Sequence, residues 1–119
     1  MIAIIFEVEP AEGHKDAYLA IAAKLRTDLE KIDGFISVER FQSITHPGKM
    51  LSLSFFRDEA AVKAWRNLPS HRAAQEAGRN GLFAGYRLRV AEVMRDYGLA
   101  ERTEAPGDSR SHHAPSPQG

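Results

Sequence analysis

Residues 35–65 have the sequence FISVERFQSITHPGKMLSLSFFRDEAAVKAW, and this stretch decides the fold. Its two apolar segments, 35–43 and 50–57, predict two strands joined by the turn-forming residues 45–48. So short a connection predicts an antiparallel hairpin. Asp58 then stands where the N-cap of a helix belongs, and the helix that follows carries its apolar residues on one side. These apolar residues are Val62, Trp65 and Leu68.

Outward from the hairpin, the chain supplies a strand and a helix before it and a strand near its end. Apolar residues alternate along 2–8, which predicts a strand, and recur every three or four positions along 14–32, which predicts an amphipathic helix. Gly34 ends that helix, because glycine readily adopts the left-handed conformation of a helix C-terminus. Residues 86–97 predict the last strand. The order β-α-β-β-α-β predicts an α+β, ferredoxin-like fold, an antiparallel sheet with both helices on one face.

Apolar side chains occur on both faces of the predicted sheet. In 2–8 and in 50–57 they occupy both alternating sets of positions. Helices cover only one face, so the other stays an exposed apolar surface unless it associates. We therefore expect a two-fold homodimer whose sheets pack together and enclose a hollow beside residues 65–86. The alternative is a monomer with a half-polar sheet face, since four polar residues also lie on these strands: Glu39, Arg40, Ser52 and Ser54.

Composition and charge are those of a globular protein of one domain. The 16 basic and 16 acidic residues leave no net charge, which argues against a nucleic-acid partner. No apolar run approaches the ~18–20 residues of a membrane span. Residues 1–10 lack the basic start of a signal peptide, so we expect a cytoplasmic protein with no membrane partner. Without cysteine, disulfides and thiolate nucleophiles are excluded.

The last twenty residues differ from the rest of the chain. Residues 100–119 contain three of the six prolines and none of the aromatic side chains. So few apolar side chains do not offset the entropy of ordering the segment. We expect one folded domain over residues 1–99 and a disordered C-terminal tail over residues 100–119.

Residues 65–86 concentrate the side chains suited to chemistry. The surrounding segment 57–95 has eight basic and four acidic residues, although the whole chain is neutral. A positive region beside an apolar interior suits an anionic or phenolate-like organic ligand. Five residues are candidates for its site: Trp65, His71, Arg79, Phe83 and Tyr86.

Several of these candidates also have a purely structural interpretation. His71 follows Ser70, a suitable N-cap, so its ring is either a base beside a cavity or a packed group at a helix start. Trp65 has the helical spacing of a core residue, and Tyr86 either lines a cavity or packs. Arg79 either clamps a carboxylate or caps the preceding helix.

Motifs for common cofactors are missing from the sequence. The glycines between positions 78 and 85 lie between a helix and a strand, whereas a dinucleotide-binding GxGxxG follows a strand. There is no phosphate-binding P-loop, no HExxH and no GxSxG. His14, His46 and His71 lack the spacing of metal ligands, so we expect no metal.

Over about residues 1–98 the chain resembles the antibiotic biosynthesis monooxygenase (ABM) family. The similarity is sharpest in FFRDEAAVKAW (55–65), HRAAQ (71–75), LF (82–83) and RVAEV (89–93). The resemblance implies a dimeric α+β barrel to which each chain contributes one sheet. That architecture agrees with the apolar character of both sheet faces.

The resemblance also implies oxygenation of a small aromatic, quinol-like substrate without metal or flavin. Such a reaction needs an apolar cavity and a base that makes the phenolate, which then passes an electron to O₂. From residue chemistry we expect His71 to be the base and Arg79 to stabilise the anion. Trp65, Phe83 and Tyr86 are expected to form the walls of the cavity.

Two other functions stay open at this point. Related family members degrade haem with an asparagine on the first strand and a histidine late in the second helical region. Here Phe6-Glu7 and Gln75 stand at those places, which leaves His71 as the candidate haem ligand. The other alternative is a non-catalytic dimeric module that binds a small apolar ligand.

Overall fold

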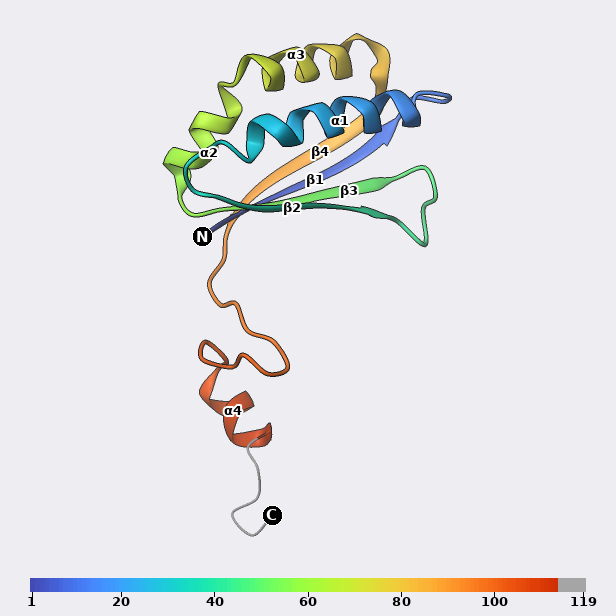
Figure 1. The fold of residues 1–119 in the computed structure, drawn as a ribbon. Coiled ribbons are helices and arrows are strands. Elements are labelled where there is room, and N and C mark those ends of the chain that lie inside the picture. Colours follow the sequence, from blue (N-terminus) through green and yellow to red (C-terminus); the bar gives the residue numbers. More distant parts are fainter. Residues whose placement is uncertain (114–119) are drawn as a thin grey trace.

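A computed structural model describes residues 1–113 of the chain as one antiparallel sheet with helices on one face (Figure 1). The strand order is β2-β3-β1-β4, which confirms the predicted β-α-β-β-α-β plan of a ferredoxin-like fold. The strands are β1 (Ile2–Pro10), β2 (Phe35–Gln42), β3 (Met50–Phe56) and β4 (Phe83–Glu92). The helices are α1 (Lys15–Leu29), α2 (Glu59–Arg66), α3 (Pro69–Ala77), η1 (Gly78–Leu82) and α4 (Gly107–His113).

Register across the sheet decides which side chains face the helices. One row across the strands is Arg40–Ser52–Phe6–Leu88, and a neighbouring row is Val38–Ser54–Ile4–Val90. Ile4 and Val38 join the core with Leu29 of α1, so both rows lie on the helix-facing side. Because successive residues of a strand point to opposite sides, Glu39 lies on the other side, away from Arg40.

Local signals set the helix boundaries. The Asp58 side chain accepts a hydrogen bond from the Ala61 backbone N–H at 2.9 Å, which confirms the predicted N-cap of α2. Pro69 is the first residue of α3, where its missing N–H costs nothing. Ser70 therefore lies inside the first turn of α3 and is not its N-cap, as the sequence had suggested.

Gly34 has the left-handed φ of +93° that the sequence predicts after α1. A Cβ at this position would lie 2.9 Å from the Ala61 Cβ, so the glycine also lets α2 approach the loop. Helix α1 itself ends at Leu29, three residues before the predicted end. Strand β4 runs from Phe83 to Glu92, so it starts and stops earlier than the predicted 86–97.

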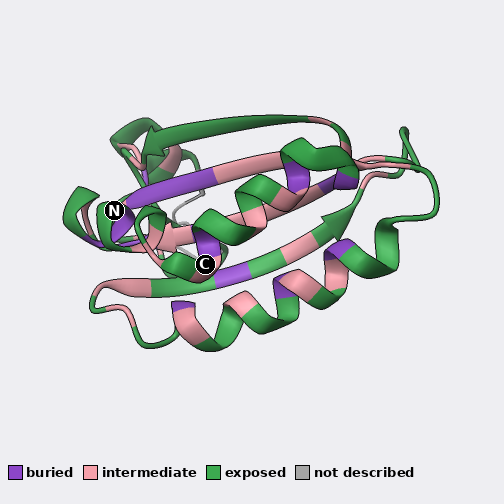
Figure 2. Ribbon diagram, turned by 90° about the horizontal axis from the view of Figure 1, so that it is seen from above, coloured by how far each residue is buried: buried purple, intermediate pink, exposed green. Residues whose placement is uncertain are grey.

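The core lies between the sheet and the helices (Figure 2). One cluster contains the buried side chains of Ile4, Leu29, Phe56 and Val62, with Trp65 packed against it. The second cluster lies farther along the sheet and contains the buried side chains of Val8, Tyr18 and Met50. Tyr18 is therefore the buried residue at the start of α1. Ala17, which the periodicity of the sequence favours for this position, is exposed.

The other sheet face, here called the open face, consists of Ala3, Ile5, Leu51, Leu53, Phe55 and their cross-strand neighbours. Leu51, Leu53 and Phe55 are only half-buried in the single chain. Of the four polar residues that favoured a half-polar face, only Glu39 lies here, because the other three are on the helix-facing side. The open face also carries Glu7, Arg87 and Arg89, and Arg89 pairs with Glu7 at 3.5 Å, so its apolar side chains lie beside a charged group toward β4.

Helix α4 lies apart from the sheet, in the segment for which the sequence predicts a disordered tail (Figure 1). Arg102 donates a hydrogen bond to the Gly98 carbonyl and lies over the Tyr97 ring, so these contacts join residues close in sequence. Residues 114–119 of the predicted tail lie outside the described residues. The division into a 1–99 domain and a tail stays a prediction. No helix within residues 1–113 has the length and apolar character to span a membrane.

Candidate functional site

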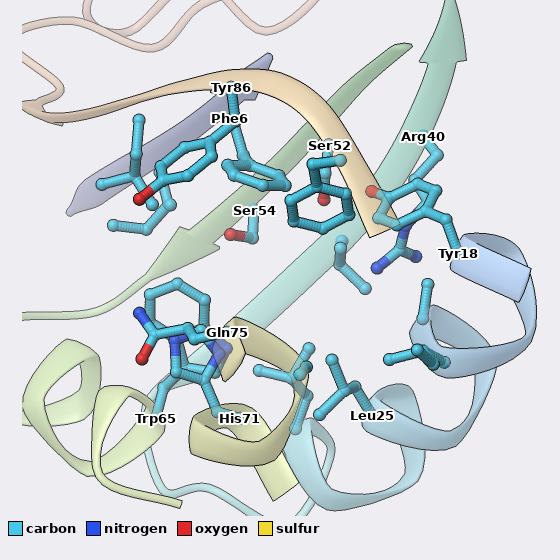
Figure 3. A pocket seen from close by; sticks show the side chains of 18 of the residues that line it. Phe6, Tyr18, Leu25, Arg40, Ser52, Ser54, Trp65, His71, Gln75 and Tyr86 are labelled. Carbon is cyan, nitrogen blue, oxygen red and sulfur yellow. The ribbon is translucent and has the colours of Figure 1, made fainter. Parts of the chain in front are cut away.

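A cavity of about 120 Å³ lies within a single chain, between the helix-facing side of the sheet and helices α1 and α3 (Figure 3). Its walls include all five residues that the sequence selected: Trp65, His71, Arg79, Phe83 and Tyr86. The predicted location of the hollow is wrong, however. We expected it between the open faces of two subunits, whereas it lies on the opposite side of the sheet, under the chain's own helices. The reason is that Ser52 and Ser54 are too small to fill the space beneath α1 and α3.

His71 occupies the inner side of the first turn of α3 and is only 8% exposed. Its ring lies against the indole of Trp65, with 4.2 Å between ring centroids and an interplanar angle of 48°. Burial, followed by the positive charges of Arg72 and Arg66, lowers the pKa of His71 to about 4. The imidazole is therefore neutral at neutral pH and keeps a lone pair that can accept a proton.

The pKa of His71 predicts how stability depends on pH. Between pH 6.5 and about 4 the unfolded chain binds a proton at this residue and the folded chain does not. The free energy of unfolding should therefore fall as the pH drops through this range, by at most about 3 kcal/mol. Chemical denaturation of the protein and of His71→Gln at several pH values measures the effect. A slope between pH 6.5 and 4 that is the same in both proteins would contradict the assignment.

Aromatic rings form one end of the cavity. Phe83 lies 5.6 Å from Tyr18, 5.9 Å from Phe6 and 6.2 Å from Tyr86, measured between ring centroids. Tyr86 also lies 5.6 Å from Phe6. Tyr86 and Leu88 both line the cavity and are exposed, so the cavity opens along β4.

Gly78 allows Phe83 to take its place in this wall. A Cβ on Gly78 would collide with the Phe83 ring. Gly78→Ala should therefore push the ring aside and lower the free energy of unfolding by about 1–3 kcal/mol. Thermal denaturation checks this, with Gly85→Ala as the control because no other group lies within 4 Å of an added Cβ there. Adding Phe83→Leu to Gly78→Ala should restore part of the lost stability, and failure to do so would point to another cause.

Two arginines line the cavity, and the sequence singled out only one of them. Arg79 is exposed in η1, directly after α3, and lies at the rim. Arg40 of β2 lines the interior, and its Nε is buried without a hydrogen-bond partner among residues 1–113. Strand alternation placed Arg40 on the same face as Val38, and this was the signal that could have found it. Arg40 was interpreted instead as part of a polar sheet face.

The described residues provide little for a metal or haem. Among residues 1–113 no three His, Cys, Asp or Glu side chains gather in a way that could hold a metal ion. Gln75 lines the cavity where haem-degrading relatives are expected to have histidine. The one imidazole in the cavity lining, His71, is packed against the indole of Trp65. The residues present therefore do not fit haem.

An antiparallel sheet with an apolar cavity beneath its helices defines a ferredoxin-like chain with a candidate small-molecule site. Residues 1–77 match the family model described as antibiotic biosynthesis monooxygenase. The chain belongs to this family.

Two curated relatives are similar to the chain. It is 48% identical over 93 residues to the jasmonate monooxygenase ABM of Pyricularia oryzae, a match that covers 78% of this chain and 43% of that protein. It is 33% identical over 70 residues to the uncharacterized protein YqjZ of Bacillus subtilis, which covers 59% of this chain and 60% of YqjZ. The chain thus spans less than two thirds of either relative.

Solved structures share the fold at low sequence identity. Rv0793 from Mycobacterium tuberculosis aligns with a TM-score of 0.73 at 18% identity, over 82% of this chain and 98% of that one. A protein from Deinococcus radiodurans aligns with a TM-score of 0.74 at 13% identity, over 83% of this chain and 98% of the other. At such identities these similarities establish the fold and leave the reaction to be argued from the site.

Proposed function

We propose that this chain is a monooxygenase that oxidises a small aromatic, quinol-like molecule with O₂ and needs no bound cofactor. The observation that carries the proposal is a buried, neutral histidine beside an indole ring inside an apolar cavity. Family membership supports the same class of reaction. The jasmonate monooxygenase is named for an organic anion, and a cavity lined by arginine and histidine suits a substrate that becomes an anion.

His71 acts first in this proposal, as the base. It takes the proton of the substrate's phenolic O–H and becomes an imidazolium beside the new phenolate. The negative charge of the phenolate favours the protonated ring and offsets the effect of Arg72 and Arg66, which lower its pKa. Arg79 at the rim is placed to stabilise the anion from the solvent side.

Oxygen then reacts with the phenolate. One electron passes from the phenolate to O₂, and the resulting radical pair combines to form a C–O bond at a ring carbon that bears hydrogen. His71 returns its proton to the peroxide, the O–O bond breaks and the ring hydrogen leaves as a proton. The products are a quinone and one water, so one oxygen atom enters each product. Trp65, Phe83 and Tyr86 hold the ring and limit water around the reacting carbon.

The homodimer is part of the same proposal. The open face presents half-buried Leu51, Leu53 and Phe55 in one row along β3, and a second copy is the simplest partner for such a surface. Sheet-to-sheet packing would not fill the cavity, because the cavity lies on the other side of the sheet. It would stiffen the sheet from which Arg40, Ser52 and Phe6 project.

Oxygen uptake tests the reaction directly. The purified chain, treated with a chelator, should consume one O₂ for each quinol oxidised across part of a panel of one-ring and two-ring quinols. With ¹⁸O₂, one labelled atom should appear in the quinone and one in water. The variant Arg26→Gln, which changes an exposed arginine on α1 outside the cavity, should retain the full rate. No uptake across the panel by the folded protein would refute an oxygenase and favour a ligand-binding module.

A further inference from the structure

Arg40 is the least satisfied charged group in the cavity. It pairs in register with Ser52, and its side chain points from β2 into the space between sheet and helices (Figure 3). Its Nε is buried and, within residues 1–113, it makes no hydrogen bond or ion pair. A guanidinium stays protonated in proteins, so the charge is not removed by titration.

Nothing in the cavity wall neutralises this charge. The lining contains Arg40, Arg79 and His71 but no aspartate and no glutamate. The carboxylate next to Arg40 in sequence, Glu39, lies on the open face because successive strand residues alternate. The Arg40 side chain is partly exposed, but its Nε is shielded from water, and a shielded donor without an acceptor destabilises the folded chain. A free donor on a guanidinium that faces a cavity is suited to an acceptor on the ligand of that cavity.

We propose that Arg40 binds the carboxylate of the substrate, so that the ligand of this cavity is a small aromatic carboxylic acid. This assignment rests on the proposed function, since it names the substrate class of the same cavity. The planar guanidinium matches the two oxygens of a carboxylate, and the hydroxyl of Ser52 lies in the neighbouring register position.

The position of Arg40 also orients the ligand. Figure 3 shows Arg40 beside Tyr18, while Trp65 and His71 lie across the cavity from it. A carboxylate on Arg40 therefore directs the other end of the molecule toward the imidazole, where the reacting hydroxyl belongs. The aromatic rings of Phe6 and Phe83 pack against each other in the cavity wall. The substrate would bind in one orientation rather than two.

Paired ligands test the assignment. We would titrate the protein with 4-hydroxyphenylacetate and several other one-ring acids, each beside its neutral amide, by calorimetry and by the fluorescence of Trp65, the only tryptophan. The acid should bind about 10–100-fold more tightly than the amide. Arg40→Gln should abolish this preference, Arg40→Lys should restore part of it, and Arg26→Gln should leave it unchanged. Equal binding of acid and amide, or no binding of any acid, would overturn the proposal.

Stability separates a ligand-binding arginine from a structural one. Arg40→Met fills a similar space and removes the unsatisfied Nε, so the melting temperature of the free protein should stay the same or rise. The same variant should lose the stabilisation that the acid confers on the parent protein. A lower melting temperature of Arg40→Met would show that the guanidinium supports the fold, and the assignment would fail.

The two proposals fail in different ways. If the acid binds through Arg40 but no quinol or phenolic acid supports oxygen uptake, the oxygenase proposal fails and the carboxylate site stands. The opposite result is that the parent protein and Arg40→Gln oxidise neutral quinols equally and bind acids no more tightly than amides. In that case the carboxylate site fails and the oxygenase stands.

Discussion

His71→Asn should reduce quinol-dependent oxygen uptake by about 100- to 10,000-fold, the usual contribution of a positioned general base. Asparagine keeps a polar group near the ring position but does not accept a proton from a phenol. The loss should fall on kcat more than on KM, because Trp65, Phe83 and Arg79 still hold the substrate. Steady-state oxygen uptake, with circular dichroism to verify the fold, measures it.

The pH profile makes this test specific. In the parent protein, kcat/KM should fall as the pH drops toward about 4, because His71 must be neutral to accept a proton. In His71→Asn, kcat/KM should no longer fall over this acidic range. The matched control is His46→Asn, which changes an exposed histidine in the β2–β3 turn. A His71→Asn protein that is folded and fully active would exclude this histidine as the base.

Leu53→Glu should convert the dimer into a monomer. Leu53 lies in the middle of β3 on the open face, opposite Ile5 of β1 and Glu39 of β2. In a two-fold dimer this one substitution adds two carboxylates to the interface, one from each subunit. An unpaired buried charge costs several kcal/mol. Sedimentation at micromolar concentration should show a particle of twice the 13.2 kDa chain mass for the parent protein and of 13.2 kDa for the variant.

A control separates loss of the interface from loss of the fold. Ile44→Glu makes the same change at a residue that is 96% exposed in the β2–β3 turn, so it should leave the dimer intact. Because Leu53 is only half-buried in the single chain, the Leu53→Glu monomer should keep its secondary structure. A parent protein that sediments as a monomer would refute the dimer and leave the cavity, which lies within one chain, unaffected.

Much of the fold was predictable because its signals are local. The alternation along β1 and the turn before β3 follow from neighbouring residues, and so do the Asp58 cap and the left-handed Gly34. The element ends were less predictable. The end of β4 depends on where β1 stops pairing with it, and that is not encoded near residue 92.

The candidate site divides in the same way. Trp65, His71, Arg79, Phe83 and Tyr86 were found from residue type and sequence proximity, and the structure brings all of them to one cavity. Arg40 was missed because it lies 25 residues before Trp65, in a strand where polar and apolar residues are mixed. Strand alternation puts it on the face of Val38, but only the pairing of β2 with β3 places it beside Ser52 in the cavity wall.

By itself the sequence determined the order of strands and helices, the apolar character of both sheet faces and the concentration of candidate groups in residues 65–86. These properties depend on periodicity, on caps and turns, and on composition, all of which act over a few residues. Only the tertiary structure decided that the cavity lies under the helices, that His71 is buried there against Trp65, and that an unpaired Arg40 faces it. Each of these depends on strand register and helix packing, which bring together residues far apart in the chain and set how much water reaches them.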